Sequence, residues 1–415
     1  MSKKSLIPED WVIVILGFLI IISALAGLVL AAPEYSWETS DQLFANVLTL
    51  SNLGNIALQL LFVVIVAATG GWLTGKPLNR QLIVFPVIYL ITIVALIIAG
   101  NAGIKSLNLE AVIFSLFIGL LIGNVFDLPE WFKQALNSEF YVKIGLILLG
   151  TTIIFADILK AGSLGLIQAL AVVLSVWYFS FWVCKKLKID SELTMMLSSA
   201  VSICGVSAAI ATSGAIKGDS KKLSLVISLV LITAVPMMIF MPYAAKLLGL
   251  SQEVTGAWLG GSIDTTGAVV ASGTLVGETA LKISSIVKFS QNVLLGLAAF
   301  AISVYWTYTK HPSAQTENKP TLSIIWDRFP KFVIGFIAAS VLFSFLLNAG
   351  QIIAVKGHLK NLQSLWFALA FTSIGLETNF GDLINKESRK PVYAFLIAQT
   401  FNVLITLAIA SLLFK

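Results

Sequence analysis

Apolar runs of about 20 residues recur along this chain and constrain its fold more than any other feature. An α-helix rises about 1.5 Å per residue, so such a run is long enough to cross the hydrocarbon core of a membrane. The chain is 58% hydrophobic and 12% charged, whereas a soluble domain carries about 25% charged residues. The sequence therefore predicts an all-α polytopic membrane protein with about thirteen transmembrane helices, near residues 11–32, 50–72, 81–101, 109–126, 140–159, 162–184, 192–216, 223–246, 253–277, 283–308, 331–353, 361–384 and 390–414.

Basic residues gather in the short connections between these runs and indicate the orientation of the chain. The excess of 27 Lys and Arg over 21 Asp and Glu is typical of cytoplasmic loops and does not indicate nucleic-acid binding. Lys3 and Lys4 precede a first run that is too long for a signal peptide, so we expect a retained first span and a cytoplasmic N-terminus.

The chain is expected to divide into four segments. Residues 1–108 form an N-terminal extension of three spans, and residues 109–308 form the first part of a core with broken helices. Residues 309–328, rich in Pro, Ser, Thr, Gln and Asn, form a cytoplasmic linker, and residues 329–415 complete the core. The runs "GLILLGTTIIFADILKAG" from Gly145 and "LAFTSIGLETNFGDLINK" from Leu369 resemble each other and are predicted to enter the membrane from opposite sides, as in an inverted repeat.

Two apolar runs are interrupted by small polar residues, as "SICGVS" from Ser202 and "SIDTTG" from Ser262. A break in a membrane helix leaves backbone groups without partners, and it is tolerated only inside protein or beside a water-filled cavity. Paired interrupted helices are the best sequence pointer to a transporter's binding site. A third candidate break is "GLETN" from Gly375.

A helix that begins inside the membrane presents free N–H groups and the positive end of its dipole, which favours an anion. The alternative is that small residues at these places only permit close helix packing. On the first interpretation the substrate-binding residues are Ser202, Cys204, Gly205, Ser207, Thr265, Thr266, Gly267 and Asn292.

Two carboxylates are candidates for ion coupling, Asp264 and Glu377. A carboxylate in a membrane span is costly and functional by default, although Asp264 is also placed to cap the helix that follows. Glu377 lies late in its span, where a solvated helix end is the alternative. Lys288 is placed to extend to the membrane interface, and the functional interpretation of this stretch has Gln291 and Asn292 lining the cavity.

Other function classes lack the residues they need. The chain contains two cysteines, Cys184 and Cys204, and two histidines, His311 and His358, both in polar connections. No histidine pair at helical spacing and no GxxxxGK[ST] motif occurs. We therefore expect neither an enzyme nor an ATP-driven pump, no metal site, and no cofactor other than coupled H⁺ or Na⁺.

Four motifs together resemble the YeiH-type sulfate exporter family of bacterial inner-membrane proteins. They are "KIGLILLGTTIIF" from Lys143, "SSAVSICGVSAAIATSGAIKGDSKK" from Ser198, "GGSIDTTGAVVASGTLVG" from Gly260 and "FTSIGLETNF" from Phe371. The resemblance implies an inner-membrane carrier related to the bile-acid-transporter and Na⁺/H⁺-antiporter architectures, with crossing broken helices in a core domain and a second domain that forms a homodimer.

The expected function is secondary active transport of a small anion such as a sulfate-like oxyanion, a sulfonate or a small carboxylate, with export implied by the resemblance. The expected partners are that anion and the lipid bilayer, and no nucleic acid. The alternative is a cation/proton antiporter of the Na⁺/H⁺ type that uses Asp264.

Overall fold

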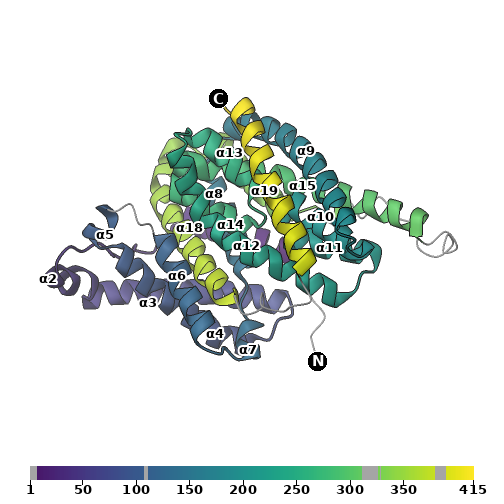
Figure 1. Ribbon diagram of the computed structural model, residues 1–415. Coiled ribbons are helices and arrows are strands. Elements are labelled where there is room, and N and C mark those ends of the chain that lie inside the picture. The colour runs from purple at the N-terminus through teal and green to yellow at the C-terminus, as the bar shows by residue number, and fades with distance from the viewer. Residues whose placement is uncertain (1–6, 107–110, 311–325, 328, 379–388) are drawn as a thin grey trace. The chain divides into compact units, whose positions relative to one another are not determined.

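Helices make up nearly all the regular structure of the computed structural model (Figure 1). It describes residues 7–106, 111–310, 326–327, 329–378 and 389–415. Within these ranges no strand is present, and one isolated bridge joins Trp37 to Asn101. The predicted all-α class is confirmed.

Six helices in the described ranges are long and apolar enough to cross a membrane. They are α3 (Leu50–Leu73), α4 (Leu78–Ala99), α9 (Phe155–Lys186), α12 (Ser220–Leu247), α15 (Glu278–Lys310) and α19 (Arg389–Leu413). Shorter apolar helices accompany them, among them α6 (Ala111–Val125), α11 (Val206–Ile216) and α14 (Thr266–Val276). A membrane protein is therefore supported, and the count of thirteen spans stays a prediction.

The chain forms two compact units, each built from two stretches that are distant in sequence. Unit 1 comprises Met1–Phe155 and Lys331–Asn379, and unit 2 comprises Ala156–Pro330 and Phe380–Lys415. The four predicted segments follow one another along the chain, whereas each compact unit combines two stretches that are distant in sequence.

Unit 1 is organised around α18 (Ala349–Glu377), which packs against α6 and α8 (Ser138–Gly150). The close contact between α18 and α6 needs a glycine, because a Cβ at Gly375 would lie 2.5 Å from Leu116 O. The other elements of this unit are α1 (Glu9–Leu25), α2 (Ser40–Gln42), η1 (Leu43–Val47), α3, α4, α5 (Ala102–Ser106), α7 (Glu130–Lys133), α17 (Lys331–Val341) and η3 (Leu342–Leu346).

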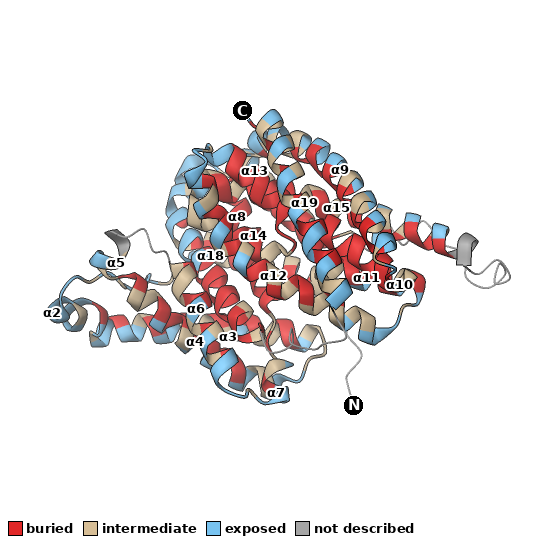
Figure 2. Ribbon diagram, viewed as in Figure 1, coloured by how far each residue is buried: buried red, intermediate tan, exposed pale blue. Residues whose placement is uncertain are grey.

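Unit 2 contains the broken helices that the sequence predicts. The run 192–216 is divided into α10 (Ser191–Ser199), the π-helix η2 (Ala200–Cys204) and α11, and the run 253–277 is divided into α13 (Gln252–Ser262) and α14. Both half-helix pairs pack against α15, and α13 also packs against α19. Most residues of α13 and α14 are buried (Figure 2).

Several predicted boundaries in unit 1 are wrong. The span predicted at 140–159 ends at Gly150. The spans predicted at 331–353 and 361–384 divide at Asn348 instead, because Asn348 and Gln351 form a capping box that starts α18. Helix α18 ends at Glu377, inside the third candidate break, where Thr378 has extended backbone angles. Asn379, the last residue of that candidate, lies outside the described residues, so this break stays a prediction.

Candidate functional site

The two helix breaks of unit 2 lie against each other. Gly205 separates η2 from α11 with φ 60° and ψ −113°, a conformation that residues with a Cβ rarely adopt. A Cβ at Gly205 would lie 2.6 Å from Val230 Cγ1 and 3.1 Å from Asp264 Cβ. The first break therefore needs glycine both for its backbone angles and for its contact with the second break.

The second break is an extended link of three residues between α13 and α14. Ile263 and Thr265 both have extended backbone angles, and the Thr265 hydroxyl accepts a hydrogen bond from Ala268 N at 3.3 Å. Thr265 is thus the N-cap of α14, and the alternative that Asp264 caps this helix is wrong.

Asp264 is 2% exposed, and its Oδ2 has no hydrogen-bond partner among the described residues. The groups that interact with this carboxylate are the Lys288 ammonium and the Gln399 side chain. A buried carboxylate whose oxygen lacks a donor is costly in a low-dielectric interior, so its presence here favours a role other than helix capping.

Lys288 lies between the two helix breaks of unit 2, and its side chain does not extend to the membrane interface. It is 1% exposed, and its Nζ donates hydrogen bonds to Ile203 O at 3.0 Å, Ile263 O at 2.9 Å and Gln291 Oε1 at 3.1 Å. One side chain therefore joins a carbonyl of η2 to a carbonyl of the link that follows α13. The substrate-site prediction missed this residue, although a lysine one turn from Gln291 and Asn292 in an apolar run was the available signal.

Three amide side chains donate hydrogen bonds to further carbonyls near the two breaks. Gln291 donates to Gly261 O at 3.0 Å, and Gln399 donates to Ser262 O at 2.9 Å. Asn402 donates to Val201 O at 3.1 Å and to Ser262 O at 3.2 Å. Two of these amides come from α19, and the sequence prediction missed both. The pair Gln399 and Asn402, three residues apart in an apolar helix, was the signal, because such residues share one helix face.

The N-terminal ends of α11 and α14 differ from these carbonyl ends. No side chain caps α11, and α14 has only the Thr265 hydroxyl. Since the first N–H groups of a helix have no partner within it, both helices present amide hydrogens at the crossing. The residues that begin the two helices are also partly exposed, namely Val206, Ser207, Thr265, Thr266 and Gly267.

Asn292 connects α15 to the beginning of α14. Its Nδ2 donates to Thr266 Oγ1 at 3.3 Å, while its Oδ1 is buried without a partner among the described residues. An unpartnered polar atom next to free helix N–H groups is consistent with a place for a ligand.

The structure thus brings together nearly all the predicted site residues in unit 2. Ser202 lies at the first break, where its hydroxyl donates to Ser198 O at 2.7 Å within its own helix. The other members of this group are Cys204, Gly205, Ser207, Asp264, Thr265, Thr266, Gly267 and Asn292.

Glu377 is the exception, because it belongs to unit 1. Its Oε1 accepts from Ser138 N at 3.0 Å and its Oε2 accepts from Ser138 Oγ at 2.6 Å, at the first residue of α8. These bonds stabilise a helix N-terminus, and the ion-coupling role of Glu377 stays a prediction.

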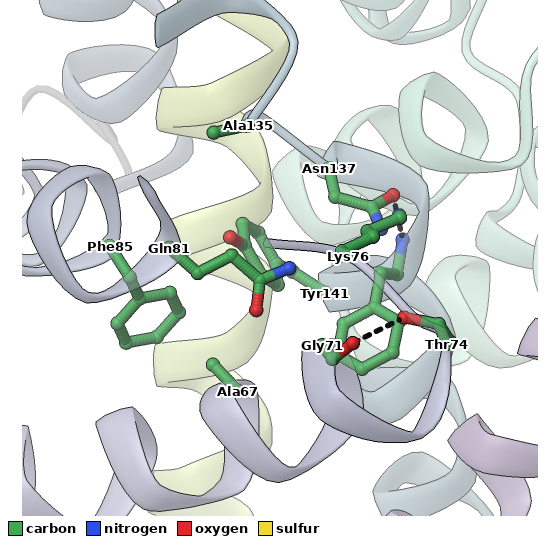
Figure 3. A pocket seen from close by; sticks show the side chains of 10 residues that line it. Ala67, Gly71, Thr74, Lys76, Gln81, Phe85, Ala135, Asn137 and Tyr141 are labelled. Atoms are coloured by element: carbon green, nitrogen blue, oxygen red, sulfur yellow. Dashed lines mark hydrogen bonds between the residues drawn. The ribbon is translucent and has the colours of Figure 1, made fainter. Parts of the chain in front are cut away.

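A small pocket lies elsewhere, in unit 1 (Figure 3). The Lys76 ammonium at this pocket already pairs with Glu9 at 3.0 Å, and the Asn137 amide caps α8. Because these two side chains are engaged with the protein itself, we do not assign this pocket to the candidate site. Its lining residues are Ala67, Gly71, Thr74, Lys76, Gln81, Phe85, Ala135, Asn137, Phe140 and Tyr141.

Comparison with known proteins places this chain among membrane proteins of one family. Residues 84–394 match the family model described as conserved hypothetical protein 698. A UPF0324 membrane protein of Rhodopirellula baltica is 40% identical over 366 residues, which cover 85% of this chain and 67% of that protein. A UPF0324 membrane protein of Nitratidesulfovibrio vulgaris is 39% identical over 375 residues, covering 86% of this chain and 63% of the relative. The chain therefore spans about two thirds of the length of these two relatives.

A relative from Nitrosomonas europaea is 27% identical and matches over 90% of this chain and 89% of its own length. A solved sodium proton antiporter from Methanocaldococcus jannaschii covers 80% of this chain and 99% of its own, at 12% identity and a TM-score of 0.20. That score is too low to establish a shared fold. The family match and the relatives near 40% identity are sufficient: the chain belongs to the UPF0324 membrane protein family.

Proposed function

We propose that this chain is a secondary active transporter of a small anion, which binds where α11 and α14 begin. The proposal rests on a difference between the carbonyl ends and the N–H ends of the half-helices at the two breaks. The carbonyls of Val201, Ile203, Gly261, Ser262 and Ile263 accept hydrogen bonds from side chains of α15 and α19, whereas the N–H ends of α11 and α14 have only one capping side chain between them.

This asymmetry favours an anion for a simple electrostatic reason. Each helix N-terminus is equivalent to a charge of about +0.5, and its N–H groups point at whatever lies in front of it. Two such ends at adjacent breaks would hold an anion without an additional cationic side chain. The partial exposure of Ser207, Thr266 and Gly267 would give the anion access.

The donors at this place suit an anion with several oxygen atoms. Ser207 and Thr266 carry hydroxyls, Asn292 carries an amide, and Gly267 allows close approach of the backbone. These groups match an inorganic oxyanion such as sulfate, a small sulfonate or a small carboxylate. The resemblance to YeiH-type sulfate exporters agrees with this class and with transport outward across the inner membrane.

Asp264 would couple the anion to a cation gradient. A fixed carboxylate next to a bound anion is unfavourable unless the carboxylate is protonated or holds a cation. Movement of the broken-helix unit would then expose the site to each side in turn, as in carriers with discontinuous helices. A homodimer with a cytoplasmic N-terminus is part of this proposal.

A cation/proton antiporter is the second candidate. It is favoured by the buried Oδ2 of Asp264, which has no partner among the described residues. The carbonyls near the two breaks that already accept hydrogen bonds argue against an antiporter, because such oxygens are the usual ligands of a cation at a broken helix.

Transport into proteoliposomes tests the proposal. Purified protein is reconstituted, and uptake of labelled sulfate, methanesulfonate and acetate is measured under imposed pH and Na⁺ gradients. We expect at least one anion to accumulate above its equilibrium level, and Asp264→Asn to remove the dependence on the cation gradient. Robust Na⁺/H⁺ exchange with no uptake of any anion would establish the second candidate instead.

A further inference from the structure

The Lys288 ammonium occupies a cage of three oxygen atoms. Its three acceptors are Ile203 O, Ile263 O and Gln291 Oε1, at 3.0, 2.9 and 3.1 Å. An ammonium group carries three hydrogens and no acceptor, so this set of partners uses its entire hydrogen-bonding capacity. No donor of Lys288 remains for the carboxylate of Asp264 or for a substrate anion.

The chain builds this cage at the point where two half-helices end. Ile203 lies in the last turn of η2, and Ile263 directly follows α13. Each helix C-terminus is equivalent to a charge of about −0.5, so both ends attract a cation to the same place.

The third oxygen is held in position by its own side chain. The Gln291 Nε2 donates to Gly261 O at 3.0 Å, which directs the Oε1 of the same amide towards Lys288. The cage therefore combines oxygens from η2, from the link after α13 and from α15, and it is preorganised by bonds that do not involve the lysine.

We propose that Lys288 is a tethered cation, which fills the position between the two breaks where a Na⁺-coupled carrier would bind free Na⁺. In broken-helix carriers, unwound carbonyls and half-helix C-termini coordinate the coupling cation. Here the same kinds of oxygen already bind an ammonium group of the protein. A filled cage leaves no place for Na⁺, so transport depends on protons and not on Na⁺.

The proton dependence resides in a small set of titratable groups. The groups that interact electrostatically with Lys288 are Asp264 from the α13–α14 link and Cys204 from η2. Gln291, one turn further along α15, is uncharged. Asp264 and Lys288 balance each other's charge, and this coupling of protons to the anion rests on the proposed function.

Removing the lysine side chain tests the cage itself, with no need for a known substrate. In Lys288→Ala the three oxygens remain and the ammonium is lost. We expect NH₄⁺, Na⁺ or K⁺ to raise the unfolding temperature of this purified variant by about 4 °C or more relative to choline at equal ionic strength. Wild-type protein should show no such difference. The matched control is Lys282→Ala on the same helix, where Lys282 is partly exposed, and it should behave like wild type.

A second variant covers the case in which Lys288→Ala does not fold. Lys288→Gln keeps a donor for the same oxygens but removes the charge, so its unfolding temperature should not respond to these cations. Failure of every cation to stabilise Lys288→Ala would overturn the proposal, and so would equal stabilisation of wild type by Na⁺.

The wild-type protein supplies an independent measurement. Replacing Na⁺ by choline at a fixed pH gradient should change anion uptake by less than about twofold, whereas a loss of more than about tenfold would contradict the tethered cation. If no anion is transported, the proposed function fails, while the cation response of Lys288→Ala still decides whether the cage exists.

Discussion

The two units treat the ends of a short internal helix in different ways. In unit 1, both ends of α8 are satisfied by neighbouring residues of the same unit. Asn137 and Glu377 accept hydrogen bonds from its first N–H groups. At its other end, the hydroxyls of Thr151 and Thr152 donate to Leu148 O and Leu149 O. This helix has no end available for a ligand.

In unit 2 only the carbonyl ends are closed. Lys288 and three amide side chains donate hydrogen bonds to five carbonyls near the ends of η2 and α13, while α11 begins at Gly205 without a capping side chain. The difference indicates how to separate a structural helix break from a functional one. A break whose two ends are both satisfied supports the fold, and a break with one open end has a place for a ligand.

The largest effect on stability should come from Lys288→Met, which removes the ammonium group that donates to the carbonyls near the two breaks of unit 2. It leaves the carbonyls of Ile203 and Ile263 without donors and Asp264 without its opposite charge. Losing one partner of a buried charge pair costs about 3–5 kcal/mol, and we expect a correspondingly lower unfolding temperature in detergent.

A double variant separates the charge from the lost hydrogen bonds. Adding Asp264→Asn to Lys288→Met should recover part of the stability, because no buried charge is then left alone. If the two losses simply add, Asp264 and Lys288 are not coupled as described.

Gly205→Ala should follow, because it strains the first break. Its φ of 60° is unfavourable for alanine, and the new Cβ would lie 2.6 Å from Val230 Cγ1. Strain of this kind costs about 1–3 kcal/mol. The control is Gly54→Ala in α3, where a Cβ would meet no atom within 4 Å, and which should be neutral or stabilising by up to about 1 kcal/mol. Equal effects at both glycines would remove the distinction.

A smaller effect is expected from Glu377→Gln, which weakens the acceptor at the closed N-terminus of α8. The loss should be about 1 kcal/mol, measured as a lower unfolding temperature, with no change in the H⁺ or Na⁺ dependence of transport. Asp264→Asn should alter the ion dependence, and it should also lower the stability because the buried Lys288 is left without its opposite charge. An ion dependence that follows Glu377 instead would restore its predicted coupling role.

The sequence predicted the features that depend on local pattern. Apolar runs gave the helical membrane class, and the small polar residues around Gly205 and Asp264 gave both breaks at their observed positions. These breaks could be predicted because glycine and short polar side chains are unfavourable for a continuous helix, and they are conspicuous inside an apolar run.

The residues that sequence reasoning missed act over long distances along the chain. Lys288 reaches Ile203 across 85 positions, and Asn402 reaches Val201 across 201. Nothing in the local pattern states which carbonyl a buried lysine or amide will reach. The local pattern around Gly375 also did not show that this glycine permits the close contact between α18 and α6.

The smallest expected effect concerns the ion pair of Lys222 with Asp190 and Glu192 in unit 2. Lys222 Nζ lies 2.7 Å from Asp190 and 3.1 Å from Glu192, all partly exposed. Burial acts to raise the pKa of Asp190, but hydrogen bonds from Lys222 and Leu193 outweigh it and lower that pKa.

Lys222→Met should therefore cost less than about 1 kcal/mol, and the cost should shrink in high salt. Because the folded pKa of Asp190 is lowered, its contribution is present above about pH 3.9 and is lost as the pH falls through the folded value. The difference in unfolding temperature between wild type and Lys222→Met should disappear at low pH. Lys221→Met, at an exposed neighbour, is the control and should show no such pH dependence.

The proposed transport depends on anion binding at the open N-terminus of α11, and a pair of substitutions at Ser207 tests this claim. An aspartate at this second position of the helix favours the helix itself, yet places a negative charge where the anion would bind. Equilibrium binding of labelled sulfate, methanesulfonate and acetate should be similar for wild type and Ser207→Asn, and weaker by more than about tenfold for Ser207→Asp. Undiminished binding by a folded Ser207→Asp protein would contradict the claim.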